Sequence, residues 1–162
     1  QMMGRWGNFF NREAFGGFTD GTFAMRLRLD QVRIGDVSEQ VMENIMNFGG
    51  VDYIQVHPTF LYESLWNLLG FCLLLLVMHK GWRKFDGMLF LLYAAWYGFG
   101  RGLIEGLRTD SLYFFSTGIR TSQMVGFVSF AAAAGIILWQ LRKGPKPENL
   151  YVNKLQDKKL NK

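Results

Sequence analysis

The sequence has few of the residues that build disulfide scaffolds or metal centres. There is one cysteine, Cys72, and there are three prolines in 162 residues. A single cysteine excludes an intrachain disulfide framework and a cysteine-based metal site, so we expect Cys72 to be packing filler or to face lipid. The sequence also lacks a nucleophilic serine elbow, a Walker loop and a His-Glu-x-x-His pair. We therefore predict neither a metal nor another cofactor.

An excess of charge of one sign is also missing from most of the chain. Residues 1–141 carry 11 Lys or Arg and 11 Asp or Glu, so the net charge of +5 comes from residues 142–162. A basic excess can indicate a nucleic-acid partner, but here it is confined to a terminal segment that follows an apolar run. We therefore expect no nucleic-acid binding and interpret these residues as cytoplasmic charge beside a membrane span.

Long apolar runs are what the sequence does contain. Hydrophobic residues make up 49% of the chain, although its mean hydropathy is only +0.05. They are concentrated in three blocks, at about 60–78, 88–107 and 124–141, and each block is long enough for one bilayer crossing. The expected fold is an all-α polytopic membrane protein with three transmembrane helices in a helical domain at residues 57–142.

The loops between these blocks predict the orientation. Lys80, Arg83 and Lys84 lie between the first two blocks, and a second basic segment, at 143–162, follows the third. Lysine and arginine in short loops stay on the cytoplasmic side. The protein is therefore predicted to be multi-pass with a cytoplasmic C-terminus. Residues 143–162, which contain Pro, Gly and many lysines, are expected to form a disordered tail.

Residues 17–56 are placed outside the membrane by the same argument. Alternating apolar and basic residues from Phe23 to Leu29 predict a strand, and residues 51–56 alternate again. Between them, apolar residues recur at helical spacing after Ser38, and Gly49-Gly50 is predicted to end that helix. We expect a small extracytoplasmic α/β cap.

Ionisable residues within an apolar block need a reason, because each costs about 2.5–3.5 kcal/mol at the centre of a membrane helix. Arg101 and Glu105 are such residues, and their i, i+4 spacing places them on one helix face. One interpretation is a structural ion pair, and the other is a site for an anionic head group. Glycines at 98, 100, 102 and 106 would let a ligand or another helix approach that face.

Two further polar clusters lie at 4–16, GRWGNFFNREAFG, and at 57–64, HPTFLYES. Arg5, Asn8 and Arg12 fall near one predicted helix face, and a segment at the membrane interface is the alternative reading. We interpret His57 as a turn residue before Pro58. Because the planar guanidinium suits a phosphodiester, the residues alone indicate a membrane enzyme or transporter that handles an anionic lipid.

These clusters resemble the motifs of the prolipoprotein diacylglyceryl transferase family. HPTFLYES is similar to H-P-x-x-L-Y-E, and YGFGRGLIEGLR at 97–108 is similar to Y-G-x-x-R-x-x-x-E-x-x-R. The resemblance covers residues 1–142, including residues 1–16 as a membrane-embedded signature segment. That segment resembles G-R-x-G-N-F-x-N-x-E-x-x-G with Gly4, Arg5, Gly7, Asn8, Phe9, Asn11, Glu13 and Gly16.

The resemblance implies an enzyme of the bacterial cytoplasmic membrane that moves the diacylglyceryl group of phosphatidylglycerol to the lipobox cysteine in a prolipoprotein signal peptide. A thioether would form and glycerol 1-phosphate would be released. By this resemblance, the catalytic residues are Arg101, Tyr97 and Glu105. The residues that bind the lipid substrate are Arg5, Asn8, Glu13 and Gly16.

Family members have further spans before the signature, including a motif with a histidine proposed as a base. This chain starts just before the signature, so we expect an upstream portion to be missing, and neither His57 nor His79 matches that histidine. The rival hypothesis is a non-catalytic transporter or lipid-binding scaffold in which Arg/Glu pairs only hold helices together. A CDP-alcohol type of head-group transferase is a weaker rival, because the paired aspartates for its metals are absent.

Overall fold

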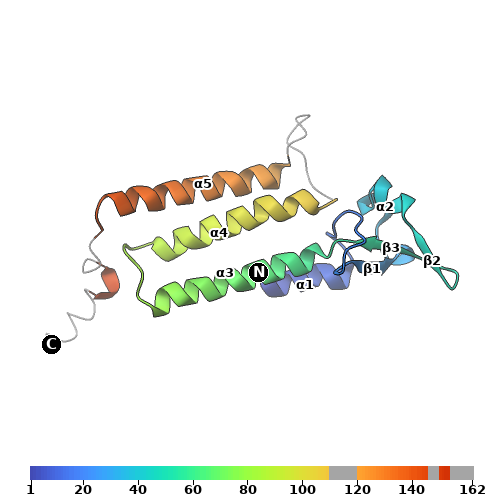
Figure 1. The fold of residues 1–162 in the computed structure, drawn as a ribbon, viewed down its shortest axis with the longest axis horizontal. Helices are drawn as coiled ribbons and strands as arrows, with labels where there is room; N and C mark the ends of the chain where they lie inside the picture. The colour runs from blue at the N-terminus through green and yellow to red at the C-terminus, as the bar shows by residue number, and fades with distance from the viewer. Residues whose placement is uncertain (110–119, 146–149, 154–162) are drawn as a thin grey trace.

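The computed structural model describes residues 1–109, 120–145 and 150–153. In these residues the fold is mostly helical, with one small sheet beyond one end of the long helices (Figure 1). Helix α4 lies between α3 and α5, and α1 lies along the half of α3 nearest the sheet. The helices are α1 (Met2–Asn11), α2 (Glu39–Glu43), α3 (Thr59–His79), α4 (Met88–Ile104) and α5 (Thr121–Arg142), and the strands are β1 (Met25–Arg28), β2 (Met46–Phe48) and β3 (Val51–Val56).

Within the described residues, two helices have the length and composition needed to cross a membrane. α3 has 21 residues with a mean hydropathy of 1.8, and α5 has 22 residues with a mean hydropathy of 1.9. Only 22% and 11% of their apolar windows are buried, so most of their apolar side chains face outward, unlike those of a core helix in a soluble protein. The middle block forms a shorter helix, because α4 has 17 residues and tightens into a 3-10 turn at Glu105–Leu107.

A reciprocal pair of tryptophans joins α3 to α4. Trp66 Nε1 donates to the carbonyl oxygen of Trp96 at 3.0 Å, and Trp96 Nε1 donates to the carbonyl oxygen of Trp66 at 2.9 Å. The two rings are stacked, with centroids 4.3 Å apart. Gly70 and Gly100 make room for the indoles, since a Cβ on them would lie 2.4 and 2.1 Å from an indole atom. The W-x-x-x-G pattern in both helices therefore builds one interlocking contact.

Glycines also bring α4 and α5 together. A Cβ on Gly98 would lie 2.6 Å from the carbonyl oxygen of Gly126, and a Cβ on Gly102 would lie 2.7 Å from the ring of Phe127. The expectation that glycines on this part of α4 admit a neighbouring helix is confirmed, with α5 contacting Gly98 and Gly102 and α3 contacting Gly100. Close backbone approach of this kind is how helices associate where water provides no hydrophobic drive.

The predicted α/β cap is present as a three-stranded antiparallel sheet in the order β1-β3-β2, with α2 beside it. The two strands that the sequence predicts are present: β1 buries Leu27 between two exposed arginines, and β3 buries Ile54 and Val56 on either side of half-buried Gln55. The apolar core beneath the sheet is built from both the signature segment and the cap. Its buried members are Phe15, Leu27, Val41, Ile54 and Val56.

The predicted helix from Ser38 to Gly49 is wrong in its second half. α2 ends at Glu43, and Met46–Phe48 is strand β2, paired with β3. Gly49 and Gly50 have φ values of 59° and 80° and form the two-residue turn between these strands. Two positive φ angles in succession fit a tight hairpin turn, so strand pairing overrides the helical spacing of the apolar residues.

One expectation changes near the N-terminus. Arg12 has a φ of 54° and ends α1, so it does not continue the helix face of Arg5 and Asn8 as predicted.

Another expectation changes near the C-terminus. Most of the tail predicted to be disordered lies outside the described residues. Of its described part, residues 150–153 fold back on the turn after α3, where the backbone N–H of Tyr151 donates to Asp86 Oδ2 at 3.2 Å. Cys72 lies exposed on α3.

Candidate functional site

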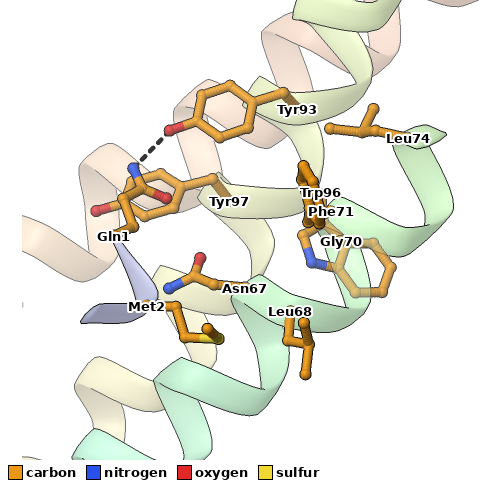
Figure 2. A pocket seen from close by; sticks show the side chains of 10 residues that line it. All are labelled: Gln1, Met2, Asn67, Leu68, Gly70, Phe71, Leu74, Tyr93, Trp96 and Tyr97. Carbon is orange, nitrogen blue, oxygen red and sulfur yellow. Dashed lines mark hydrogen bonds between the residues drawn. The ribbon is translucent and has the colours of Figure 1, made fainter. Parts of the chain in front are cut away.

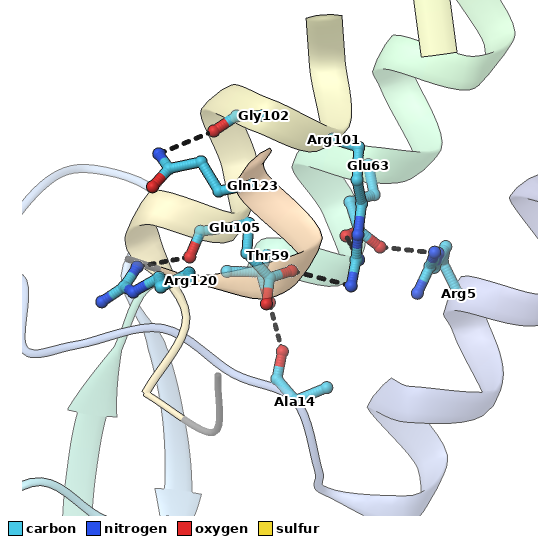
Figure 3. Close-up of polar contacts among 9 residues, drawn as sticks. All are labelled: Arg5, Ala14, Thr59, Glu63, Arg101, Gly102, Glu105, Arg120 and Gln123. Atoms are coloured by element: carbon cyan, nitrogen blue, oxygen red, sulfur yellow. Dashed lines mark hydrogen bonds and ion pairs between the residues drawn. The ribbon is translucent and has the colours of Figure 1, made fainter. Parts of the chain in front are cut away.

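Four charged side chains form a continuous network from α1 through α3 to the end of α4 (Figure 3). Arg5 Nε lies 2.6 Å from Glu63 Oε2, and Arg101 Nη1 lies 3.1 Å from Glu63 Oε1. Arg101 Nη2 in turn lies 2.7 Å from Glu105 Oε2. Glu63 therefore bridges the two arginines, and Arg101 bridges the two carboxylates. We call these four residues the charged network.

Helix packing places the network in the interior. α1 rests on α3 through aromatic contacts, with the ring centroids of Phe9 and Phe60 4.8 Å apart and those of Trp6 and Phe60 5.2 Å apart. The side chains of Glu63 and Glu105 are only 7% and 3% exposed. Buried carboxylates are tolerated when they are paired, and here two guanidinium and two carboxylate groups balance in charge.

The Arg101–Glu105 contact agrees with the ion-pair interpretation of their spacing, but the pair does not stand alone. Arg101 also reaches across to α3, and Arg120, from just before α5, donates to the backbone carbonyl oxygen of Glu105 (Figure 3). Gln123 Nε2 donates to the carbonyl oxygen of Gly102 at 2.9 Å. The end of α4 is therefore held by α3 on one side and by α5 on the other.

Tyr97 lies one turn before Arg101 on α4, and its ring stacks on Tyr93 with centroids 6.0 Å apart. Tyr97, Arg5, Glu63 and Arg101 line one small cavity of about 10 Å³. Within the described chain, Tyr97 makes no hydrogen bond to Arg101. It is thus beside the charged network and not part of it.

The other signature residues build the turn that leaves α1. The carbonyl oxygen of Asn8 accepts from the Glu13 N–H at 3.0 Å, and Glu13 Oε1 accepts from Asn11 Nδ2 at 3.1 Å. The Gly16 N–H donates to the carbonyl oxygen of His57 at 2.9 Å, and a Cβ on Gly16 would lie 2.7 Å from that of His57. Among the described residues, the side chains of Asn8 and Glu13 form no hydrogen bond or ion pair with the charged network, and the Gly16 backbone bonds to His57 instead.

The two histidines lie in different places. His57 Nδ1 is 3.2 Å from the hydroxyl oxygen of Tyr62, just before α3 begins. His79 is in the last turn of α3, at the end of the helices opposite the cap. Among the described residues, no group of three His, Cys, Asp or Glu side chains is placed to hold a metal ion.

Glu63 is the site residue that sequence reasoning missed. It lies within HPTFLYES and within the first apolar block, but the sequence alone assigns it no role. The signal was the same one that singled out Arg101 and Glu105, namely an ionisable side chain within a membrane-length apolar run. Its two partners lie 58 residues before it and 38 residues after it, so no local pattern could identify them.

A larger cavity of about 360 Å³ opens next to the network, between the start of α1, α3 and α4 (Figure 2). Asn67 and Tyr97 line both this cavity and the small one at Arg5 and Arg101. Its other walls are mostly apolar, with Leu68, Phe71 and Leu74 among them, and Gln1 Nε2 donates to the hydroxyl oxygen of Tyr93 at 2.5 Å. An apolar space therefore adjoins the arginines.

Fold and site together define a class: a helical protein with outward-facing apolar helices that buries an Arg/Glu network beside an apolar cavity. The sequence matches the family model for prolipoprotein diacylglyceryl transferase over residues 1–139. The chain belongs to this family, which confirms the resemblance seen in its motifs.

Curated relatives named phosphatidylglycerol–prolipoprotein diacylglyceryl transferase align with nearly the whole chain. The protein from Lactiplantibacillus plantarum is 46% identical over 146 residues, which cover 90% of this chain and 47% of that protein. The protein from Enterococcus faecalis is 43% identical over 159 residues, covering 98% of this chain and 51% of that protein. The chain thus spans about half the length of the curated relatives it matches. No solved structure matches it significantly.

Proposed function

We propose that the protein transfers the diacylglyceryl group of phosphatidylglycerol to the lipobox cysteine thiol of prolipoproteins. The observation that carries this proposal is the charged network, which joins the family signature at Arg5 to the late-helix motif at Arg101 through Glu63. Relatives that are 43–46% identical over at least 90% of this chain carry the corresponding name. A scaffold that only held helices together would not need two arginines on one carboxylate beside an apolar cavity.

The reaction is a displacement at carbon. The cysteine sulfur attacks the carbon of the diacylated glycerol that bears the phosphate ester. A C–S bond forms there while the bond between that carbon and the phosphate oxygen breaks. Glycerol 1-phosphate leaves with the bonding electrons, and the thiol proton passes to the released phosphate or to solvent. Negative charge collects on the departing oxygen, and a guanidinium held in place before the reaction stabilises it.

The network leaves donors for such an anion. A guanidinium has five N–H groups, and Arg5 uses only its Nε toward Glu63 in the described structure. Arg101 is held by one carboxylate on each terminal nitrogen. We assign the lipid phosphate to the open side of Arg5 and the leaving oxygen to Arg101.

The remaining residues act by positioning these two arginines. Glu105 orients Arg101, and Tyr97 closes the wall between Arg101 and the apolar cavity. Asn8, Glu13 and Gly16 shape the turn that sets α1, and with it Arg5, against α3. The apolar cavity of about 360 Å³ would take part of an acyl chain, because its apolar wall begins where the charged network ends.

We place this site in the outer half of the bacterial cytoplasmic membrane, in a multi-pass protein with a cytoplasmic C-terminus. The cap lies at one end of the helices (Figure 1), and the charged network lies toward the same end, since Glu63 is near the start of α3 and Arg101 near the end of α4. At the opposite end, the turn with Lys80, Arg83 and Lys84 lies near residues 150–153, joined by the Tyr151–Asp86 hydrogen bond. Two basic segments at one end support a cytoplasmic location for both.

The test uses a chimera, because the chain matches about half of its relatives. The chain replaces the matching half of the L. plantarum relative, and transfer from phosphatidylglycerol is followed by the mass gain of a lipobox peptide. We expect transfer by the chimera, and a loss of most of it in Arg101→Lys, because lysine lacks the planar fork that holds two carboxylates. Arg33→Lys, on the exposed cap surface, is the matched control. Full transfer by Arg101→Lys would contradict the assigned role, and lipid binding without transfer would favour the scaffold hypothesis.

A further inference from the structure

A second groove, of about 320 Å³, lies on the opposite side of α4 from Glu63, between α4 and α5. Tyr97 and Arg101 line it from α4, so Arg101 borders both this groove and the charged network. From α5 it is lined by Thr121, Ser122 and Ser129, together with Val125 and Gly126. We call this space the hydroxyl groove.

The hydroxyl groups are concentrated in an unusual place. α5 has a mean hydropathy of 1.9, yet Thr121, Ser122 and Ser129 lie on the face that it turns toward α4. Ser122 and Ser129 are seven residues, or about two helical turns, apart and so lie in one row, Thr121 lies next to Ser122 in the first turn of α5, and Tyr97 lies in the facing wall. In the part of the chain that the structure describes, none of these four hydroxyl groups has a hydrogen-bond partner.

Unpaired hydroxyl groups in an apolar span are costly unless a ligand or water satisfies them. A row of hydroxyls, each both donor and acceptor, is suited to another polyol. Arg101 is the one charged residue among the described lining residues, and its charge is balanced by Glu63 and Glu105, so the lining favours an uncharged polyol. Gly98 and Gly126 also line the groove, and there the backbones of the two helices approach each other closely.

We propose that the hydroxyl groove receives the free glycerol of the phosphatidylglycerol head group while Arg5 holds the phosphate and Arg101, which borders the groove, faces the departing oxygen. The groove is then the site that distinguishes a glycerol head group from other head groups. This inference rests on the proposed transferase function and adds to it a specificity site that the family motifs do not contain, since Thr121, Ser122 and Ser129 lie outside all three motifs. It also gives Tyr97 a second role, because Tyr97 lines the groove from α4.

The direct test measures lipid binding to this chain in nanodiscs. Phosphatidylglycerol is compared with phosphatidylmethanol, which has the same singly charged phosphodiester but no glycerol head group. The unaltered chain should prefer phosphatidylglycerol, and Ser122→Ala/Ser129→Ala should lower that preference about fivefold or more, the effect of losing about 1 kcal/mol or more of hydrogen bonding. Ser122→Thr/Ser129→Thr keeps both hydroxyls and should restore much of the preference. Val128→Ala, on the exposed face of α5, is the matched control.

The outcomes separate the groove from the transferase. Equal binding of both lipids by the unaltered chain, or an unchanged preference in a folded Ser122→Ala/Ser129→Ala variant, would overturn the groove proposal whatever the chimera does. If the chimera transfers from phosphatidylglycerol in the same experiments, the proposed function stands without the groove. If the serine variant loses the lipid preference while the unaltered chimera transfers nothing, the groove stands as a binding site and the transferase proposal fails.

Discussion

The cap and the helical region distribute their side chains in opposite ways. In the cap, Val41, Ile54 and Val56 are completely buried, as in a water-soluble domain. In the helical region, the buried polar or charged residues include Glu63 and Glu105, while many large apolar side chains face outward. These exposed side chains include Leu65, Phe71, Phe90, Val125, Val128 and Leu138.

This difference shows that two kinds of interaction stabilise one chain. The cap is held by the removal of apolar surface from water. Helices surrounded by lipid gain little in that way, so close backbone packing, indole hydrogen bonds and paired charges must hold them. Substitutions should therefore have different signatures in the two regions: lost apolar volume matters in the cap, whereas added atoms and lost charge matter between the helices.

The largest expected effect is at Glu63. Glu63→Gln removes the buried charge that Arg5 and Arg101 share, so Arg5 loses its carboxylate partner and Arg101 keeps only Glu105. Breaking a buried pair in this way costs about 3–5 kcal/mol. We expect a strongly lowered unfolding temperature in detergent and loss of transfer in the chimera. Glu43→Gln, at the exposed end of α2, should leave both unchanged, and a stable, active Glu63→Gln variant would exclude Glu63 as the bridge.

Arg5 should separate lipid binding from helix packing. Arg5→Ala should cost about 1.5–3 kcal/mol in affinity for phosphatidylglycerol, the scale of charge-assisted hydrogen bonds. Affinity for phosphatidylethanolamine, whose head group is neutral overall, should fall much less. Lipid binding to the chain in nanodiscs measures both. An equal loss for the two lipids would indicate that α1 has lost its place on α3, which a parallel unfolding measurement would detect.

The indole contact between α3 and α4 should be sensitive to one added carbon. Gly100→Ala places a Cβ 2.1 Å from Trp66 Nε1, and such overpacking costs about 1–3 kcal/mol. Gly135→Ala on α5 is the matched control, because nothing lies within 4 Å of its added Cβ. The unfolding temperature in detergent should therefore be lower for Gly100→Ala than for Gly135→Ala. Equal stability would mean that the indole can move aside, and that the contact does not set the spacing of the helices.

The smallest expected effect is in the cap core. Ile54→Val removes one methylene group from a fully buried position and should cost about 0.5–1.5 kcal/mol. Hydrogen exchange of β1 and β3 should rise while that of α3 stays the same, since the cap core does not include the helix interior. Increased exchange throughout α3 would show that the two regions unfold together, and would weaken the contrast drawn between them.

The sequence by itself determined the features that depend on near neighbours. The apolar blocks became α3, α4 and α5 because hydropathy is a local property, and the spacing of Arg101 and Glu105 placed them in contact because i and i+4 share a helix face. The alternation in 51–56 became β3 for the same reason. Family membership also followed from short motifs that keep their residues in order.

Only the tertiary structure decided which distant segments meet. Residues 46–48 form a strand because β3 lies beside them and Gly49-Gly50 can turn, although their apolar spacing suits a helix. Glu63 became the centre of the charged network because α1 and α4 pack on opposite sides of it. The tryptophan pair likewise joins residues 30 positions apart. Contacts of this kind depend on how helices and strands assemble, and a local pattern contains no information about the partner.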